Sequence, residues 1–463
     1  MDPAARPPAP HRPNRRPARL PVAARRRHDR EILALALPAF GALVAEPLFV
    51  MVDSAVVGHL GTAQLAGLGV AATLLTTAVN VFVFLAYATT AAVSRRVGAG
   101  DLPAALRQGM DGVWLALLLG ALVIAAVLPT APGLAELCGA SPTAAPYAAE
   151  YLRISALGIP GMLVVLAATG VLRGLQDTRT PLVVAVAGFT VNAGLNALLV
   201  YGTGLGIAGS AWGTVTAQTG MAAAYLVMVV RGARRQAPHE WRGVLRPHAA
   251  GIRTCARAGV PLLVRTVSLR AVLVIATAVA ARLGDTQIAA HQITLTVWSL
   301  LAFALDAIAI AGQAVIGRYL GADDPDGARA ACSRMVQWGL LCGAGLGIAV
   351  SAAHTLVGPV FTADPAVRHA LASALLVVAL VQPVCGVVFV LDGVLMGAGD
   401  GPYLAWSMLV TLAVFAPAAL AVPALGGGLT ALWWAMGLMM LTRLAALWLR
   451  SRSGRWVVTG ASR

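Results

Sequence analysis

The sequence predicts an all-α membrane protein of twelve transmembrane helices arranged as two pseudo-symmetric six-helix lobes. Three observations support this fold class: the composition, the recurrence of apolar runs of membrane-spanning length, and an internal repeat. Of the 463 residues, 59% are hydrophobic and only 11% are charged, whereas a soluble protein usually has about 25% charged residues. A water-soluble surface could not cover so much apolar side chain with polar groups, so the chain is predicted to lie in a bilayer.

Apolar runs long enough to span a membrane recur along the chain. A helix needs roughly 20 such residues to cross the hydrocarbon layer. Only helices fit these lengths, because lipid offers no other hydrogen-bond partner to the backbone. The predicted spans are 32–58, 65–93, 112–130, 147–171, 181–202, 208–230, 259–281, 288–317, 333–353, 370–396, 403–424 and 429–449.

Basic residues test the topology that these spans imply. All 34 are arginine, and 28 of them fall on the side of the amino terminus, against three (Arg153, Arg282 and Arg368) on the other side. This asymmetry is the positive-inside rule. It predicts that both termini are cytoplasmic in a multi-pass protein of the cell (inner or plasma) membrane. Because the arginines mark loops, the net charge of +15 does not indicate a nucleic-acid partner.

An internal repeat at a constant shift of 223 residues is the third observation. Its identities include proline, arginine, glutamine and aspartate, which chance would not readily place at one offset without a gap. The matched pairs include Pro38 with Pro261, Gly61 with Gly284, Gln64 with Gln287, Arg95 with Arg318, Asp101 with Asp324, Pro160 with Pro383, and Asp177 with Asp400. Six spans per copy give both copies the same orientation, as in transporters with parallel repeats.

These patterns divide the chain into five segments. Residues 1–30 contain seven prolines and nine arginines, which predicts a disordered cytoplasmic tail. The first lobe is expected over 31–231, a cytoplasmic inter-lobe linker over 232–257, the second lobe over 258–450, and a cytoplasmic tail over 451–463.

Two facing lobes favour a cavity that opens alternately to either side, and therefore a transporter of small molecules. The sequence contains no HExxH, no GxSxG and no paired histidines, so we do not expect an enzyme. The five cysteines have no CxxC spacing, which predicts free thiols and no metal site. No nucleotide-binding loop and no cofactor motif is found, and we expect a monomer.

Acidic residues within the first span are the leading candidates for ion coupling. Glu46 and Asp53 are seven residues apart, which places them on one helix face about two turns apart. A carboxylate held at membrane depth can take up a proton near neutral pH. Two structural alternatives stay open: Asp53 near the outer end could touch water or cap a helix, and Glu46 could organise the kink at Pro47.

Polar residues of two further spans are candidates for the same cluster. Asn192 and Asn196 are one turn apart in the span 181–202, and Thr214 and Gln218 have the same spacing in the span 208–230. They could hold a ligand or a proton, but amides and hydroxyls also join membrane helices together.

The second lobe has its own charged set. Asp306 and Asp392 are its membrane acids, and Arg265 and Arg270 lie in the span 259–281. Equal numbers of opposite charges indicate ion pairs. A paired carboxylate is a poor proton carrier because the cation stabilises its charged form. The first lobe is therefore the better candidate for coupling.

Several stretches resemble the multidrug and toxic compound extrusion (MATE) family, particularly its DinF-like branch. The resemblance runs in order from about residue 31 to residue 450. It rests on the first-span motif Met51-Val52-Asp53-Ser54-Ala55-Val56-Val57-Gly58-His59-Leu60-Gly61 and on the stretches 289–293, 304–307, 312–313 and 391–397.

The resemblance implies a V-shaped bundle of two six-helix lobes. It also implies export of organic cations and other amphiphiles in exchange for protons or sodium ions. By resemblance, Asp53 matches the acid tied to proton coupling, and Asn192 and Thr214 match its polar partners. Asp392 matches an acid that serves a cation site in another branch, and Asp306 matches an acid of the DinF-like branch.

This chain departs from the family pattern at two places. A position that is often aspartate is Asn196, so a site of two carboxylates in the first lobe cannot be assumed, and Glu46 is the candidate second acid. The span 259–281 has Arg265 and Arg270 and no acid, which weakens the sodium reading. The alternative function is a lipid-linked oligosaccharide flippase of related architecture, which would need a strongly cationic cavity.

Overall fold

The computed structural model describes residues 22–236, 238 and 241–461, and for a few helical residues, Glu46 and Asp53 among them, only the backbone. Across these residues the fold is helical, without strands. The first half contains α1 (Val22–Gly58), α2 (Thr62–Val81), α3 (Phe84–Gly98), α4 (Leu102–Leu137), α5 (Ala145–Ala156), α6 (Ile159–Gly174), α7 (Arg179–Ala197), the π-helix η1 (Leu198–Gly202) and α8 (Gly206–Gln236).

The second half begins with the short helix α9 (Trp241–Leu245). It continues with α10 (Ala249–Arg282), α11 (Asp285–Gly321), α12 (Pro325–Phe361), α13 (Pro365–Gly397), α14 (Gly401–Ala424) and α15 (Leu429–Ser453). Within the described residues, 10 stretches are long and apolar enough to cross a membrane, and the bent pair α5–α6 makes an eleventh. With α1, this gives the twelve spans that the sequence predicts.

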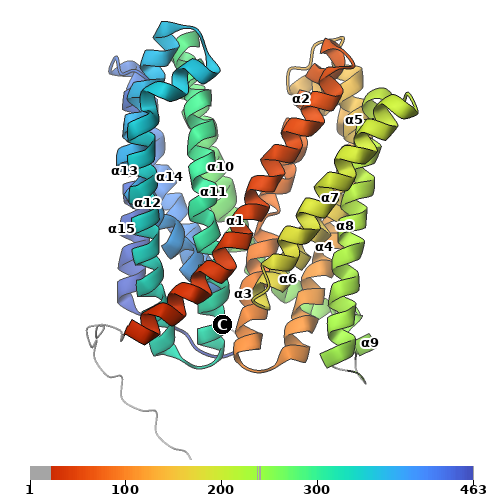
Figure 1. Ribbon diagram of the computed structural model, residues 1–463, viewed down its shortest axis with the longest axis vertical. Coiled ribbons are helices and arrows are strands. Elements are labelled where there is room, and N and C mark those ends of the chain that lie inside the picture. The colour runs from red at the N-terminus through yellow and green to blue at the C-terminus, as the bar shows by residue number, and fades with distance from the viewer. Residues whose placement is uncertain (1–21, 237, 239–240, 462–463) are drawn as a thin grey trace, which may run out of the picture.

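Figure 1 shows the helices as two groups that diverge at the upper end and meet at the lower end. The second-half helices α10 to α15 form one lobe, and α2 to α8 form the other. Helix α1 runs diagonally from the lower end of the second lobe to the upper end of the first, packing against α11 and α7. The two lobes come together where α3 packs against α11. The architecture is the predicted V-shaped bundle.

The internal repeat reappears as matching local structure. Gly61 and Gly284 precede α2 and α11 with φ of 144° and 106°, a backbone region that side chains rarely enter. Asp101 and Asp324 then cap α4 and α12, accepting hydrogen bonds from the backbone N–H groups of Ala104 and Gly327 at 3.0 and 2.7 Å. These pairs keep the 223-residue offset that relates the two copies.

The two lobes differ in helix continuity. The first-lobe span from Thr62 to Gly98 is divided between α2 and α3, and α5 and α6 meet at 51°. Their second-lobe counterparts, α11 and α13, are continuous. Pro160 is the second residue of α6, where the backbone N–H that proline lacks would have no partner within the helix. The helix interruptions among the described residues of these spans thus lie in the first lobe.

Three predicted boundaries differ from the structure. Residues 22–30, expected in a disordered tail, form the first turns of α1, because Ala and Arg favour helix and Asp29 is held by α12. Residues 1–21 lie outside the described part. The predicted linker 232–257 is largely helical: α8 extends to Gln236 and α10 begins at Ala249.

Helix α9 within this linker is docked on the first lobe. The indole N–H of Trp114 in α4 donates to the backbone oxygen of Leu245 at 3.0 Å. The guanidinium carbon of Arg234 lies 4.3 Å from the ring centre of Trp241, a cation–π contact. The connection between the lobes is therefore fixed to the first lobe along much of its length.

Candidate functional site

The polar cluster of the first lobe lies between α7 and α8. Asn192 and Asn196 are each 1% exposed, and the amide N–H of Asn192 donates to the hydroxyl of Thr214 at 3.4 Å. At Gly213 an added β-carbon would lie 2.0 Å from the side-chain oxygen of Asn196. The absent side chain at Gly213 is what lets Asn196 reach α8. The structure thus brings together three of the polar residues that the sequence singled out.

The side chains of Glu46 and Asp53 lie outside the described residues, and their coupling roles stay predictions. Their backbone belongs to α1, which packs on α7. The hydroxyl of Tyr201 in η1 donates to the backbone oxygen of Val56 at 2.6 Å. Helix α1 is therefore tied, within one turn of Asp53, to η1, which directly follows α7 and its two asparagines.

A buried charge cluster lies in the second lobe. The Nε of Arg265 donates to Asp392 Oδ1 at 3.2 Å, and its terminal nitrogen pairs with Oδ2. Arg443 in α15 donates to the same Oδ2 at 3.1 Å. Asp392 is 4% and Arg443 5% exposed. Two guanidinium groups thus share one carboxylate, so the cluster holds two cations against one acid.

Arg443 was not among the residues proposed from the sequence. The sequence does contain a signal for it: Arg443 lies inside the predicted span 429–449, so the arginine count assigns it to neither side of the membrane. The structure places Arg265 and Asp392 together as an ion pair. The predicted simple balance of two acids and two arginines is wrong, because α15 supplies a third cation.

Asp306 and Arg270 do not join this cluster. Neither side chain makes a hydrogen bond or ion pair with the described part of the chain. Asp306 is half-buried in α11, and the cations that act on its charge are those of Arg173 and Arg265. Arg173, which falls just outside the predicted span 147–171, lies in the last turn of α6 in the other lobe. Asp306 therefore experiences charges from both lobes.

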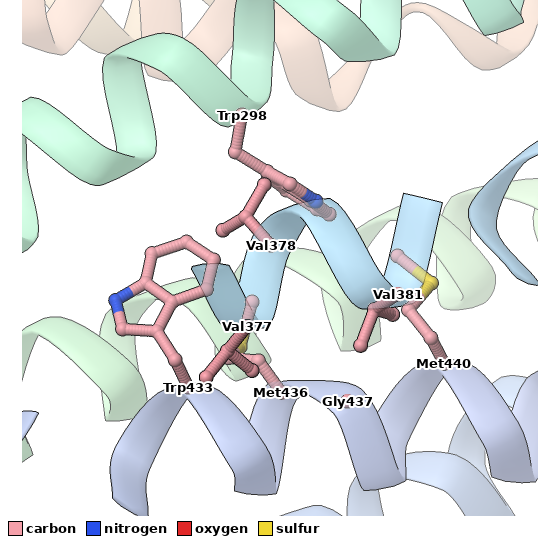
Figure 2. Close-up of a pocket in the computed structure, with 8 residues that line it drawn as sticks. All are labelled: Trp298, Val377, Val378, Val381, Trp433, Met436, Gly437 and Met440. Carbon is pink, nitrogen blue, oxygen red and sulfur yellow. The ribbon is translucent and has the colours of Figure 1, made fainter. Parts of the chain in front are cut away.

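Figure 2 shows a small cavity in the second lobe, lined by Trp298, Val377, Val378, Val381, Trp433, Met436, Gly437 and Met440. The two indole rings lie 6.5 Å apart and edge to face. The cavity volume is about 10 Å³, room for about one water molecule. In this conformation it is a packing gap between α11, α13 and α15, too small for an organic substrate.

No metal centre is found: within the described ranges, no three His, Cys, Asp or Glu side chains gather closely enough to hold an ion. A larger cleft, of about 530 Å³, lies beside the first turns of α1 at the lower end. It is lined by Arg26, Arg27, Arg30, Glu31, Ala34 and Arg318. Its chemistry is that of a basic surface.

The fold and these clusters define a multi-pass membrane transporter built from two six-helix lobes. A family model described as MatE matches residues 38–198 and again 261–423. The two matches begin 223 residues apart, the offset of the internal repeat. The chain belongs to the MatE family of multidrug and toxic compound extrusion transporters.

Relatives similar over nearly the whole chain extend this finding. One is Protein DETOXIFICATION 44, chloroplastic, of Arabidopsis thaliana, 33% identical over 92% of this chain and 83% of that protein. Another is DNA damage-inducible protein F of Escherichia coli (strain K12), 31% identical over 92% of this chain and 94% of that protein.

Solved structures show the same fold at lower identity. The bent form of the Vibrio cholerae MATE transporter VcmN matches with a TM-score of 0.85 and 20% identity, covering 93% of this chain and 98% of that one. An outward-facing multidrug resistance MATE transporter matches with a TM-score of 0.81 and 19% identity, covering 92% and 95%.

Proposed function

We propose that the chain is a secondary active efflux antiporter. It exports organic, often cationic and amphiphilic compounds in exchange for protons, or for sodium ions, by alternating access across the inner or plasma membrane. The observation that carries this proposal is the V-shaped pair of repeat-related lobes. These lobes are packed together at one end and diverge at the other. Such a pair can exchange one opening for the other by rocking about its contact.

The arginine distribution orients the molecule. The lower end of Figure 1, where α3 meets α11, carries Arg95, Arg96 and Arg318 and the start of α1. By the positive-inside rule this end is cytoplasmic, and both termini lie there. The conformation described then opens outward. We further propose that the protein acts as a monomer, since each chain contains both lobes.

Helix α1 is the element through which ion binding could act on both lobes. It contacts α11 at its lower part and α7 along its upper part. Protonation of Asp53, helped by Glu46, Asn192 and Thr214, would change the charge of α1 next to η1 and α8. A neutral Asp53 no longer attracts a cationic substrate, so proton entry and substrate release are coupled with the sign of an antiporter.

The second-lobe acid is a poor candidate for coupling. Two arginines bind Asp392, so both of its carboxylate oxygens are already occupied by cations of the protein itself. We therefore assign coupling to the first lobe and a structural role to the Arg265–Asp392–Arg443 cluster. Asp306, which forms no ion pair with an arginine in the described part of the chain, is the second-lobe acid left for a further role.

The test uses everted membrane vesicles and a fluorescent organic cation. Wild-type vesicles should take up the cation when their interior is acidified, and Asp53→Asn should abolish this uptake. The control Glu136→Gln, an exposed acid of α4, should transport normally. Uptake driven by a sodium gradient alone would identify sodium as the coupling ion. Normal proton-driven uptake by Asp53→Asn would overturn the assignment, and transport of a lipid-linked oligosaccharide alone would favour the flippase.

A further inference from the structure

Arg95 of the first lobe is bonded to the second lobe at the lower end of the molecule. Its side chain is 3% exposed although it carries a charge. One terminal nitrogen donates to the backbone oxygen of Gly460 at 3.1 Å. The other donates to the backbone oxygens of Ala398 at 2.8 Å and Val458 at 2.9 Å. All three acceptors follow helices of the second lobe, namely α13 and α15.

The segment 454–461, which contains two of these acceptors, was expected only as a tail. It folds back beneath the bundle after α15 ends at Ser453. Trp456 is 2% exposed, and its indole N–H donates to the backbone oxygen of Ser451 at 2.9 Å. The N–H of Gly460 donates to the backbone oxygen of Leu320 in α11 at 3.0 Å. One edge of the segment is thus fixed to α11 of the second lobe and the other to Arg95 of the first.

The repeat counterpart of Arg95 makes the complementary connection. Arg318 in α11 forms an ion pair with Glu31 at the start of α1, the helix that leads into the first lobe. Two residues before Glu31, Asp29 accepts hydrogen bonds from Arg334 of α12 on both of its oxygens, at 2.6 and 2.8 Å. These hydrogen bonds hold the pKa of Asp29 below its ordinary value, so Asp29 stays charged at neutral pH. Each lobe therefore uses its repeat-matched arginine to hold a segment that belongs with the other lobe.

We propose that segment 454–461 is a latch on the cytoplasmic gate and that Arg95 is the positioning residue that closes it. The proposal rests on the alternating access described above. Opening the lower end requires α3 to leave α11, and Arg95 moves with α3 while its three acceptors stay with the second lobe. A buried guanidinium cannot lose its acceptors without being hydrated, so release of the latch accompanies inward opening. The Arg318–Glu31 pair is the matching latch at α1.

The test measures the distance between the lobes in the full-length protein by double electron–electron resonance, without substrate. One spin-label pair is placed at the lower end, at Arg107 of α4 and Asp326 of α12. The other is placed at the upper end, at Leu137 of α4 and Val360 of α12. All four positions are exposed. Arg95→Ala should lengthen the lower distance and shorten the upper one, raising the inward-open population by roughly tenfold or more, because hydrogen bonds to a charge are the strong ones.

The matched control is Arg96→Ala. Arg96 is the next residue in α3, but it donates to Gln108 Oε1 at 3.1 Å within its own lobe. It should leave both distances unchanged. A chain that ends after Ser453 should reproduce the effect of Arg95→Ala and provides the answer if that variant does not fold. Arg95→Lys, with one charge but fewer donors, should fall between wild type and Arg95→Ala.

Equal distances in Arg95→Ala, in the shortened chain and in wild type would overturn the latch. This outcome is distinct from failure of the proposed function, because the distances are read without transport. A protein that shifts as expected but carries no cation would retain the latch and lose the antiporter assignment.

Discussion

Gly321 of α11 lies against the backbone oxygen of Arg95 in α3, where an added β-carbon would be 1.9 Å from that oxygen. The same contact recurs with the repeats exchanged: a β-carbon on Gly98 would lie 2.0 Å from the backbone oxygen of Arg318. Two contacts related in this way place the pseudo-two-fold axis between α3 and α11. The closed end of the transporter is therefore built on two glycines that the repeat supplies together.

This contact predicts that one methyl group added at either glycine would push the two lobes apart. Gly98→Ala or Gly321→Ala should push α3 from α11 and lower the stability of the closed end by about 1–3 kcal/mol, as overpacking does. The distances across the lower end would report the change. Gly345→Ala in α12 is the control, because nothing lies within 4 Å of its added β-carbon. Wild-type distances in both variants would show that the helices accommodate the methyl groups elsewhere.

The second-lobe charge cluster predicts an unequal response to removing its members. Asp392→Asn leaves two buried arginines without their carboxylate and should lower the free energy of unfolding by about 3–5 kcal/mol. Arg443→Gln should cost less, because Arg265 still holds Asp392 through both of its oxygens. Heating these variants in a Cys138→Ser background with a thiol-reactive dye reports the loss as a lower unfolding temperature, since the buried Cys332 and Cys385 react only on unfolding.

Asp326→Asn is the control for that series, since the side chain of Asp326 is 93% exposed. It should unfold at the wild-type temperature. Equal unfolding temperatures for Asp392→Asn and Asp326→Asn would contradict the structural role assigned to the cluster.

The close approach at Gly213 predicts a test of the first-lobe polar site. Gly213→Ala places a methyl group 2.0 Å from the side-chain oxygen of Asn196. Asn196 must then turn away or α7 must move from α8, and proton-driven efflux should fall several-fold. Gly220→Ala lies in the same helix with nothing within 4 Å and should transport normally. Equal transport by the two variants would remove Asn196 from the coupling site.

The exposed Cys138 predicts the orientation in the membrane. It follows α4 at the end where the lobes diverge, whereas Cys255, Cys332 and Cys385 are buried. A membrane-impermeant maleimide added to intact cells should label the protein, and Cys138→Ser should abolish the label. Labelling of Cys138 only in everted vesicles would reverse the proposed topology.

The pairing of polar residues shows how far the sequence could reach. The one-turn spacing of Asn192 and Asn196, and of Thr214 and Gln218, follows from helical periodicity. Asn192 does contact Thr214. Arg443 was missed because its partner Asp392 is 51 residues away in another helix. No spacing rule connects residues that only helix packing brings together.

The segment after α15 makes the same point. From residue 451 onward the sequence reads as a polar tail, with Arg452, Ser453 and Arg455. The fold leaves room for this segment beneath the ends of α3 and α11. Only there is Trp456 buried, and only there do the backbone oxygens of Val458 and Gly460 accept hydrogen bonds from Arg95. Backbone acceptors carry no side-chain signature, so their use by Arg95 could not be read from composition.

The sequence by itself determined that the chain lies in a membrane, how many spans it has and that its two halves are repeats. These are properties of local composition and of a fixed offset, and they need no knowledge of which helices touch. The tertiary structure alone decided that α1 joins both lobes, that α15 supplies a second arginine to Asp392, and that Arg95 closes on the segment beyond Ser453. The physical reason is that inside a bilayer charged groups must find partners across helices, and packing geometry, not sequence distance, selects those partners.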